Sequence, residues 1–215
     1  MSKVLDLGYG SGSATIAWKS HGHEVVGVDW ATNATIQGDF TTPEVWERIR
    51  QSGPYDFVWF APDCSIFSMA GSLPWDENYN PTSERARDEV SGIVWVLQQI
   101  HSMNPRYGWM MENPRAMMRK MAFVKRLHRV TVSYCQYGDS RMKPTDFFGH
   151  IPGSFRPRIC VYGASCHDAA PRGSRSGTQS MTKEEAGKMP YRLSKEIMDA
   201  VLESRGETYP RLEDF

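Results

Sequence analysis

The sequence predicts an α/β fold built on a doubly wound, mostly parallel sheet. Two observations carry this prediction: short β-branched or aromatic runs alternate with helix-like segments before residue 150, and glycines or acidic residues follow several of these runs directly. Such alternation favours parallel strands joined by right-handed crossovers. Because ligands bind these sheets at the carboxyl ends of the strands, we expect the functional residues there.

The elements are predicted in chain order from these runs. The first strand, residues 3–7, leads through a glycine turn into a helical segment at 14–19. Further strands are expected at 24–30, 56–60, 107–111 and 130–134, and helices at 42–51, 84–102, 115–126 and 191–204. We expect three segments: an α/β catalytic domain at 1–150, an irregular Pro-, Gly- and Arg-rich segment at 151–186, and a C-terminal segment at 187–215 whose helix packs back on the domain.

The composition excludes a strong overall electrostatic attraction to nucleic acid or membranes. The 215 residues contain 25 Lys+Arg and 25 Asp+Glu, so nucleic-acid contacts must come from local patches. No run approaches the roughly 20 apolar residues of a membrane span, and no signal pattern opens the chain. We therefore expect a cytoplasmic protein without a membrane partner.

The four cysteines are expected to be free thiols without a metal. Cys64, Cys135, Cys160 and Cys166 show no C-x-x-C spacing. Cys160, Cys166 and His167 offer a partial zinc ligand set that Cys135 would have to complete. Structural zinc normally uses more closely spaced ligand pairs.

The first strand opens onto a glycine turn, DLGYGSGS, at residues 6–13. Such a turn lets a ligand approach the backbone just before a helix begins. A dinucleotide-binding fingerprint would need a third glycine where this chain has Ser13. Asp29 ends the second strand and can accept both hydroxyls of a ribose. Together these features favour an adenosine-containing cofactor.

Two further residues fit an adenine ring. Trp30 offers a flat face, and Asp39, beside Phe40, offers a carboxylate for the amino group. The alternative is that Trp30 is a core aromatic and Asp39 a turn residue.

A cysteine and a glutamate follow neighbouring runs of the predicted sheet. Cys64 lies in a loop, stiffened by Pro62, directly after the third strand. Glu112, followed by Asn113, ends the fourth strand. A carboxylate there is costly to bury without a partner or a task.

In this order, DLGYGSGS, the Asp29-Trp30 pair, GDF, PDCSIFS and ENP resemble the successive motifs of cytosine carbon-5 DNA methyltransferases. The resemblance covers residues 3–145 by motif and 187–202 more loosely. It implies the Rossmann-like class I fold of S-adenosylmethionine (SAM)-dependent methyltransferases, with SAM as cofactor and DNA, or RNA, as partner. The cofactor-binding residues that it implies are Asp6, Gly8, Tyr9, Gly10, Gly12, Asp29, Trp30, Asp39, Phe40 and Pro62.

The resemblance also implies a mechanism. Cys64, as thiolate, adds to carbon 6 of cytosine while Glu112 protonates or hydrogen-bonds nitrogen 3, and carbon 5 then takes the methyl group. A target base in a duplex would have to be flipped out of the stack. The implied catalytic residues are Cys64, Glu112, Arg141 and Lys143, and Ser68 and Asn113, which lie in the matching motifs, are candidate substrate contacts. Arg115, Arg172 and Arg175 are candidate nucleic-acid contacts because they lie in basic stretches, and the alternative for residues 172–179 is a solvated loop.

The sequence departs from the family in several places. Asp63 replaces a proline and Ser65 a glutamine beside the cysteine, and Arg141 and Lys143 keep only part of a Gln-x-Arg-x-Arg motif. The stretch between residues 145 and 187 is too short for a usual target-recognition domain, as in small phage-encoded methylase-like proteins. A basic run at 115–129 is a candidate phosphate-contacting surface.

Two alternatives stay open. One is a pyrimidine carbon-5 methyltransferase that acts on RNA or a nucleotide through the same thiol. The other is a catalytically silent protein that keeps the cofactor fold and binds nucleic acid.

Overall fold

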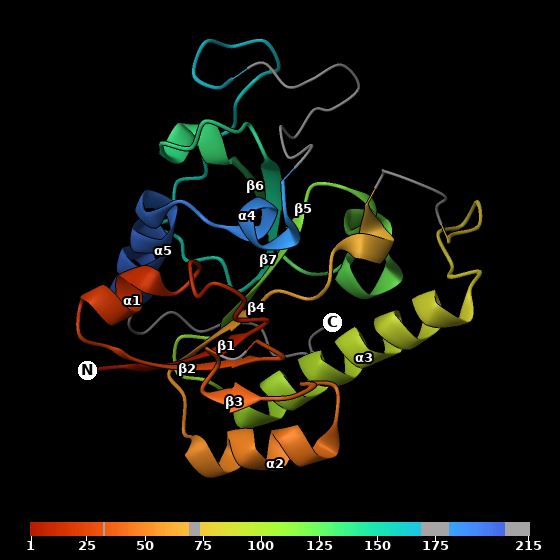
Figure 1. Cartoon of the computed structure of the whole chain (residues 1–215), viewed down its shortest axis with the longest axis vertical. Coiled ribbons are helices and arrows are strands. Elements are labelled where there is room, and N and C mark those ends of the chain that lie inside the picture. The colour runs from red at the N-terminus through yellow and green to blue at the C-terminus, as the bar shows by residue number, and fades with distance from the viewer. Residues whose placement is uncertain (32, 69–73, 169–180, 205–215) are drawn as a thin grey trace.

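The computed structural model describes residues 1–31, 33–68, 74–168 and 181–204. The described chain forms a seven-stranded sheet in the order β3-β2-β1-β4-β5-β7-β6 (Figure 1). The strands are β1 (Lys3–Leu7), β2 (Glu24–Asp29), β3 (Ile36–Gln37), β4 (Phe57–Phe60), β5 (Trp109–Pro114), β6 (Arg129–Ser133) and β7 (Pro144–Gly149). Strands β1 to β5 pair in parallel, whereas β7 runs antiparallel to both β5 and β6.

The predicted fold class is confirmed. The sheet is doubly wound and mostly parallel, with one antiparallel strand, β7, between β5 and β6. The five predicted strands are present, with ends that shift by at most three residues. Two strands were not predicted: β3 has only two residues, and β7 begins with a proline and carries a buried aspartate.

The helices also follow the prediction, with two exceptions: the helix predicted at 115–126 is absent, and a short helix at 183–187 was not predicted. The structure contains α1 (Ile16–Ser20), α2 (Pro43–Ser52), α3 (Glu84–Met103), α4 (Lys183–Gly187) and α5 (Tyr191–Glu203). No helix among the described residues is long and apolar enough to cross a membrane.

The predicted helix at 115–126 is wrong. In its place the chain forms two 3₁₀ turns, η2 (Met117–Lys120) and η3 (Ala122–Val124), separated by extended backbone at Met121. Met117, Met118 and Met121 are buried, and Arg119 binds Asp146 of β7 with two hydrogen bonds. These tertiary contacts override the local helix propensity.

Two apolar layers cover the sheet. Helices α2 and α3 pack on one face, and α1 and α5 lie on the other (Figure 1). Ser194 of α5 ties the second layer together, because its hydroxyl donates to the Ala14 carbonyl (2.7 Å) and accepts from the Ala17 amide (3.3 Å). The C-terminal helix is therefore anchored directly behind the glycine turn.

Candidate active site

An open cleft of about 2800 Å³ lies across the carboxyl ends of the parallel strands. It brings together most of the residues predicted from the sequence. Those that line it are Gly8, Tyr9, Gly10, Asp29, Trp30, Asp39, Phe40, Pro62, Cys64, Ser68, Glu112, Asn113, Arg115 and Lys143. Asp6, Gly12 and Arg141 do not line it. Arg172 and Arg175 lie outside the described residues.

Gly8 fixes the contact between the glycine turn and the loop that follows β4. Its φ is +83°, and a Cβ added there would lie 2.2 Å from the Ala61 carbonyl oxygen. The Ala61 amide in turn donates to the Leu7 carbonyl at 2.8 Å. Only glycine combines this conformation with so close an approach. Glycine at position 8 therefore allows the glycine turn and the loop after β4 to pack in direct contact.

Asp29 organises the same turn from the end of β2. One carboxylate oxygen accepts from the Gly10 amide (2.9 Å) and the other from the Ala31 amide (3.1 Å). Trp30 beside it is 74% exposed and is therefore not a core aromatic. An exposed indole next to an ordered carboxylate is a suitable surface for a nucleoside.

Asp39 forms a turn and also lines the cleft. Its Oδ1 accepts from the Thr41 amide (2.8 Å) and the Thr41 hydroxyl (2.7 Å). Phe40 packs edge-on against Phe60, with 5.8 Å between the ring centroids. The turn interpretation of Asp39 is correct, and the residue also lies where a ligand in the cleft can reach it.

Asp6 and Gly12 shape the turn from behind. Asp6 is fully buried, accepts a 2.6 Å hydrogen bond from the Thr15 hydroxyl, and has its pKa raised to about 7 by that burial. Gly12 has a φ of +72°, and a Cβ there would lie 2.4 Å from the Tyr9 hydroxyl oxygen. Both residues therefore support the turn without lining the cleft.

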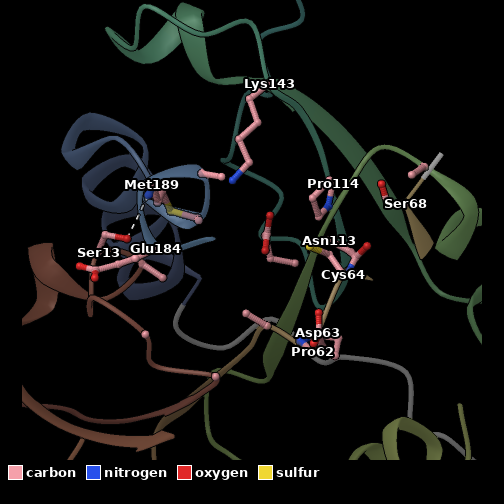
Figure 2. Close-up of a pocket in the computed structure, with 18 of the residues that line it drawn as sticks. Ser13, Pro62, Asp63, Cys64, Ser68, Asn113, Pro114, Lys143, Glu184 and Met189 are labelled. Atoms are coloured by element: carbon pink, nitrogen blue, oxygen red, sulfur yellow. Dashed lines mark hydrogen bonds between the residues drawn. The ribbon is translucent and has the colours of Figure 1, made fainter. Parts of the chain in front are cut away.

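Cys64 precedes the short turn η1 (Ser65–Phe67), in the loop that leaves β4. The two residues that depart from the family pattern both hold this loop. Asp63 Oδ1 accepts from the Ser65 amide (2.8 Å), and the Ser65 hydroxyl accepts from Arg85 of α3 (2.9 Å). Cys64 and Asn113 are both among the residues that line the cleft (Figure 2).

Glu112 reaches the same edge from the neighbouring strand. The pairing of Phe60 with Met111 places the loop of Cys64 and the residue Glu112 at adjacent strand ends. Burial raises the pKa of Glu112, and the positive charge of Lys143 opposes that effect. Glu112 Oε1 is shielded from solvent and has no hydrogen-bond partner among the described residues. The same is true of both side-chain amide atoms of Asn113. Three buried polar atoms at this edge therefore have no hydrogen-bond partner among the described residues, and a bound ligand could supply one.

Lys143 brings a positive charge to these groups. It is 5% exposed, and burial lowers its pKa while Glu112 and Cys64 act to raise it. Its φ of +26° is strained for a residue with a side chain, and such strain clusters at functional sites. Figure 2 shows the side chain extending into the space between Cys64 and Met189.

Arg141 has a different environment from Lys143. Its guanidinium forms an ion pair with Asp139 and donates to the carbonyls of Glu185 (2.8 Å) and Lys188 (2.9 Å). Arg141 thereby holds the segment before α5 against the cleft. The Met189 amide in that segment donates to the Ser13 hydroxyl at 3.0 Å (Figure 2).

Several lining residues were missed by the sequence analysis. Tyr134 is fully buried beneath Lys143, and its place directly after a β-branched run could have identified it. Val161 and Tyr162 line the cleft although they are 73% and 67% exposed. Nothing in their sequence surroundings indicates this position.

The basic run divides into two groups. Arg119 is used internally, since it binds Asp146 and Thr131. The other members are exposed, and they are Arg115, Lys120, Lys125, Arg126 and Arg129.

No protein-family model matches the chain, and no curated protein matches it either. The chain is similar to a crystal structure of a triple mutant of Spodoptera frugiperda DNMT2, with 17% sequence identity and a TM-score of 0.44. The similarity covers 79% of this chain and 58% of that one. This chain therefore matches little more than half of the length of that protein. No functional statement follows from a likeness at this level.

Proposed function

We propose that the chain is a SAM-dependent methyltransferase that transfers a methyl group to carbon 5 of cytosine in DNA, through a covalent adduct with Cys64. One observation carries the proposal. The cleft beside the glycine turn is lined by the thiol of Cys64, the buried carboxylate of Glu112 and the buried ammonium group of Lys143. This combination suits addition of a thiolate to a pyrimidine.

The residues at the glycine turn fit the cofactor. The close approach at Gly8 leaves backbone uncovered at the cleft, while Asp29 and the exposed ring of Trp30 offer contacts for a ribose and an adenine. When bound, SAM supplies an electrophilic methyl group. Pro62 and Cys64 follow Ala61, which touches this turn, so the thiol lies on the same side of the sheet.

The chemistry follows from the three charged or nucleophilic groups. The thiolate of Cys64 forms a bond to carbon 6, and the π electrons of the carbon 5–carbon 6 bond move into the ring. Glu112, whose raised pKa favours its protonated form, donates a hydrogen bond or a proton to nitrogen 3 and stabilises that charge. With SAM bound, carbon 5 would then take the methyl group, and S-adenosylhomocysteine would be the leaving group. Loss of the carbon 5 proton to water or a base re-forms the double bond and expels the Cys64 thiolate.

Lys143 and Arg141 take separate parts in this scheme. The Lys143 charge stabilises the anionic forms of Cys64 and Glu112 at the edge of the open cleft. Arg141 is a positioning residue, because its donors are directed to Asp139 and to the carbonyls before α5. Asn113, with both amide atoms unsatisfied, is our candidate for reading the edge of the base.

A second candidate substrate is a pyrimidine in RNA or in a free nucleotide. The segment at 151–186 is short and the net charge is balanced. Both features favour this second candidate, because they limit the surface that can bind a DNA duplex. The exposed basic residues beside Arg115 favour a polynucleotide over a free nucleotide.

The test is transfer of tritiated methyl groups from SAM to duplex DNA, RNA and dCMP in parallel assays, with the intact protein and with Cys64→Ser. We expect label at carbon 5 of cytosine in DNA, lost in the variant, while both proteins bind SAM equally. Label only in RNA or dCMP would move the assignment to the second candidate. SAM binding without transfer to any of the three would overturn the enzymatic proposal.

A further inference from the structure

Four side chains that play no part in the proposed reaction meet beside the cleft. They are Cys135, Cys160, Cys166 and His167, and their sulfur or ring-nitrogen atoms all lie within 4.8 Å of one another. The Sγ atoms of Cys160 and Cys166 are 3.2 Å apart, and those of Cys166 and Cys135 are 3.7 Å apart. His167 Nδ1 lies 3.6 Å from the sulfurs of both Cys160 and Cys166.

Three of these four separations lie close to the edges of one metal tetrahedron, and the 3.2 Å between the sulfurs of Cys160 and Cys166 is shorter than such an edge. With Zn–S bonds of about 2.3 Å and Zn–N bonds of about 2.0 Å, tetrahedral angles require roughly 3.8 Å between sulfurs and roughly 3.5 Å between sulfur and nitrogen. Three thiolates with one imidazole form a known structural zinc ligand set. A tetrahedral set of sulfur and nitrogen ligands without oxygen donors selects zinc over magnesium, calcium or manganese.

The backbone brings the ligands together by contacts that need no metal. Cys135 lies in the turn η4 (Tyr134–Tyr137) directly after β6, and the Cys160 amide donates to the Ser133 hydroxyl at 3.0 Å. On the far side of the cluster, the Asp168 amide donates to the Ser140 carbonyl at 2.8 Å. The approach of residues 160–168 to β6 is therefore fixed at both ends, and the ligands between them are presented to one point.

A neighbouring amide supports the sulfur ligands. Gln136 Nε2 lies 3.2 Å from Cys166 Sγ and 3.9 Å from Cys135 Sγ, as a donor to both. Hydrogen bonds of this kind to coordinating thiolates are typical of the residues that surround a metal site. A disulfide between Cys160 and Cys166 would use two of the sulfurs and would leave the third thiol and the imidazole at the same point without a function.

We propose that Cys135, Cys160, Cys166 and His167 bind one structural zinc ion that fastens residues 160–168 to the end of β6. This departs from the expectation of metal-free thiols, which rested on the wide ligand spacing in the sequence. The site adjoins the cleft, because Cys160 and the next residue, Val161, line it and Cys135 follows Tyr134, the residue beneath Lys143. Zinc would therefore stiffen the wall opposite the glycine turn.

The test is metal analysis of the intact chain purified under reducing conditions, by inductively coupled plasma mass spectrometry. We expect one zinc ion per chain. After removal of zinc by a chelator, addition of Co²⁺ to the reduced protein should give the visible bands of tetrahedral cobalt and the near-ultraviolet bands of sulfur-to-cobalt charge transfer. These spectra need no variant, so they test the ligand set even where a substitution impairs folding.

Variants then identify the ligands. Cys166→Ser and His167→Ala should each lower zinc retention during dialysis against a competing chelator by tenfold or more, whereas Cys64→Ser should retain zinc like the intact chain. A reduced protein without zinc that gives no cobalt spectrum would overturn the proposal. So would iron in place of zinc, or a native protein whose mass and peptide map show a disulfide between Cys160 and Cys166.

Discussion

The ammonium group of Lys143 lies 4.5 Å from the centroid of the Tyr134 ring, in a position that leaves Lys143 only 5% exposed. A buried cation is costly unless opposite charge or an aromatic face compensates for the loss of water. Glu112, Cys64 and the Tyr134 ring provide that compensation. The backbone at Lys143 has a strained φ of +26°. We attribute this strain to the position of the ammonium group, which interacts there with Glu112 and Cys64.

Lys143→Met is expected to lower methyl transfer about 100-fold, by analogy with other electrostatic stabilisers of a transition state. Affinity for SAM should change little, because the proposed contacts to the cofactor are those of Asp29, Trp30 and the glycine turn. The Lys143 charge lowers the pKa of Glu112, so its removal should shift the basic limb of the pH–rate profile upward. Lys3→Met is the control, because Lys3 is a partly buried lysine whose ammonium group also lies over a tyrosine ring, 5.7 Å from the centroid of Tyr55. An unchanged rate and profile in Lys143→Met would remove this residue from the mechanism.

Glu112→Gln keeps the shape of the side chain but cannot give a proton to the base. We expect a loss of 10²- to 10⁴-fold in kcat, the usual contribution of a general acid, with little change in affinity for SAM. Burial raises the pKa of Glu112, so the rate of the intact enzyme should fall as pH rises through that raised value, and the variant should lack this limb. The exposed Glu44→Gln is the matched control. Equal rates for Glu112→Gln and the intact protein would contradict the assigned role.

Gly8→Ala and Gly22→Ala form a matched pair. Both glycines have left-handed backbones, with φ of +83° and +78°, but only at Gly8 would a Cβ meet another atom, the Ala61 carbonyl oxygen at 2.2 Å. The left-handed conformation alone costs about 1 to 2 kcal/mol. We expect Gly8→Ala to cost roughly 2 kcal/mol more than Gly22→Ala in urea unfolding, because the overlap forces the backbone to move. Gly8→Ala should also abolish SAM binding, and equal effects of the two substitutions would refute the close contact.

Asp6→Asn should alter how stability depends on pH. Burial raises the pKa of Asp6 from 3.8 to about 7, so between these values the folded state holds a proton that the unfolded state has lost. The free energy of unfolding of the intact protein therefore falls as pH rises from about 4 to about 7. Relative to the intact protein, Asp6→Asn should gain on the order of 2 to 4 kcal/mol between pH 4 and pH 8. Chemical unfolding at both pH values measures this, with the exposed Asp199→Asn as control, and a gain of zero would contradict the assigned protonation.

Much of the site could be predicted because its residues follow strands. Asp29, Cys64 and Glu112 each come at or just after the end of an apolar run, and parallel pairing brings such ends to one edge. Pattern and spacing were enough to group these residues in one cleft.

The remaining features depend on contacts that no local pattern contains. The carbonyls that Arg141 binds, those of Glu185 and Lys188, lie 44 and 47 residues away along the chain, so its contact with the segment before α5 is not visible from its motif. The helix predicted at 115–126 fails because buried methionines and the Arg119–Asp146 pair impose another backbone path. Cys135 and Cys160 meet only because the segment after β7 returns to the end of β6.

Covalent trapping tests most directly whether Cys64 is the nucleophile. The intact protein and Cys64→Ser are incubated with SAM and a DNA duplex in which 5-fluorocytosine replaces cytosine, and the products are separated on a denaturing gel. Fluorine at carbon 5 cannot leave as a proton does, so the account predicts a stable protein–DNA adduct with the intact protein and none with Cys64→Ser. A protein that methylates ordinary cytosine at carbon 5 but forms no adduct, or an adduct that persists in Cys64→Ser, would contradict the assignment of Cys64 as the nucleophile.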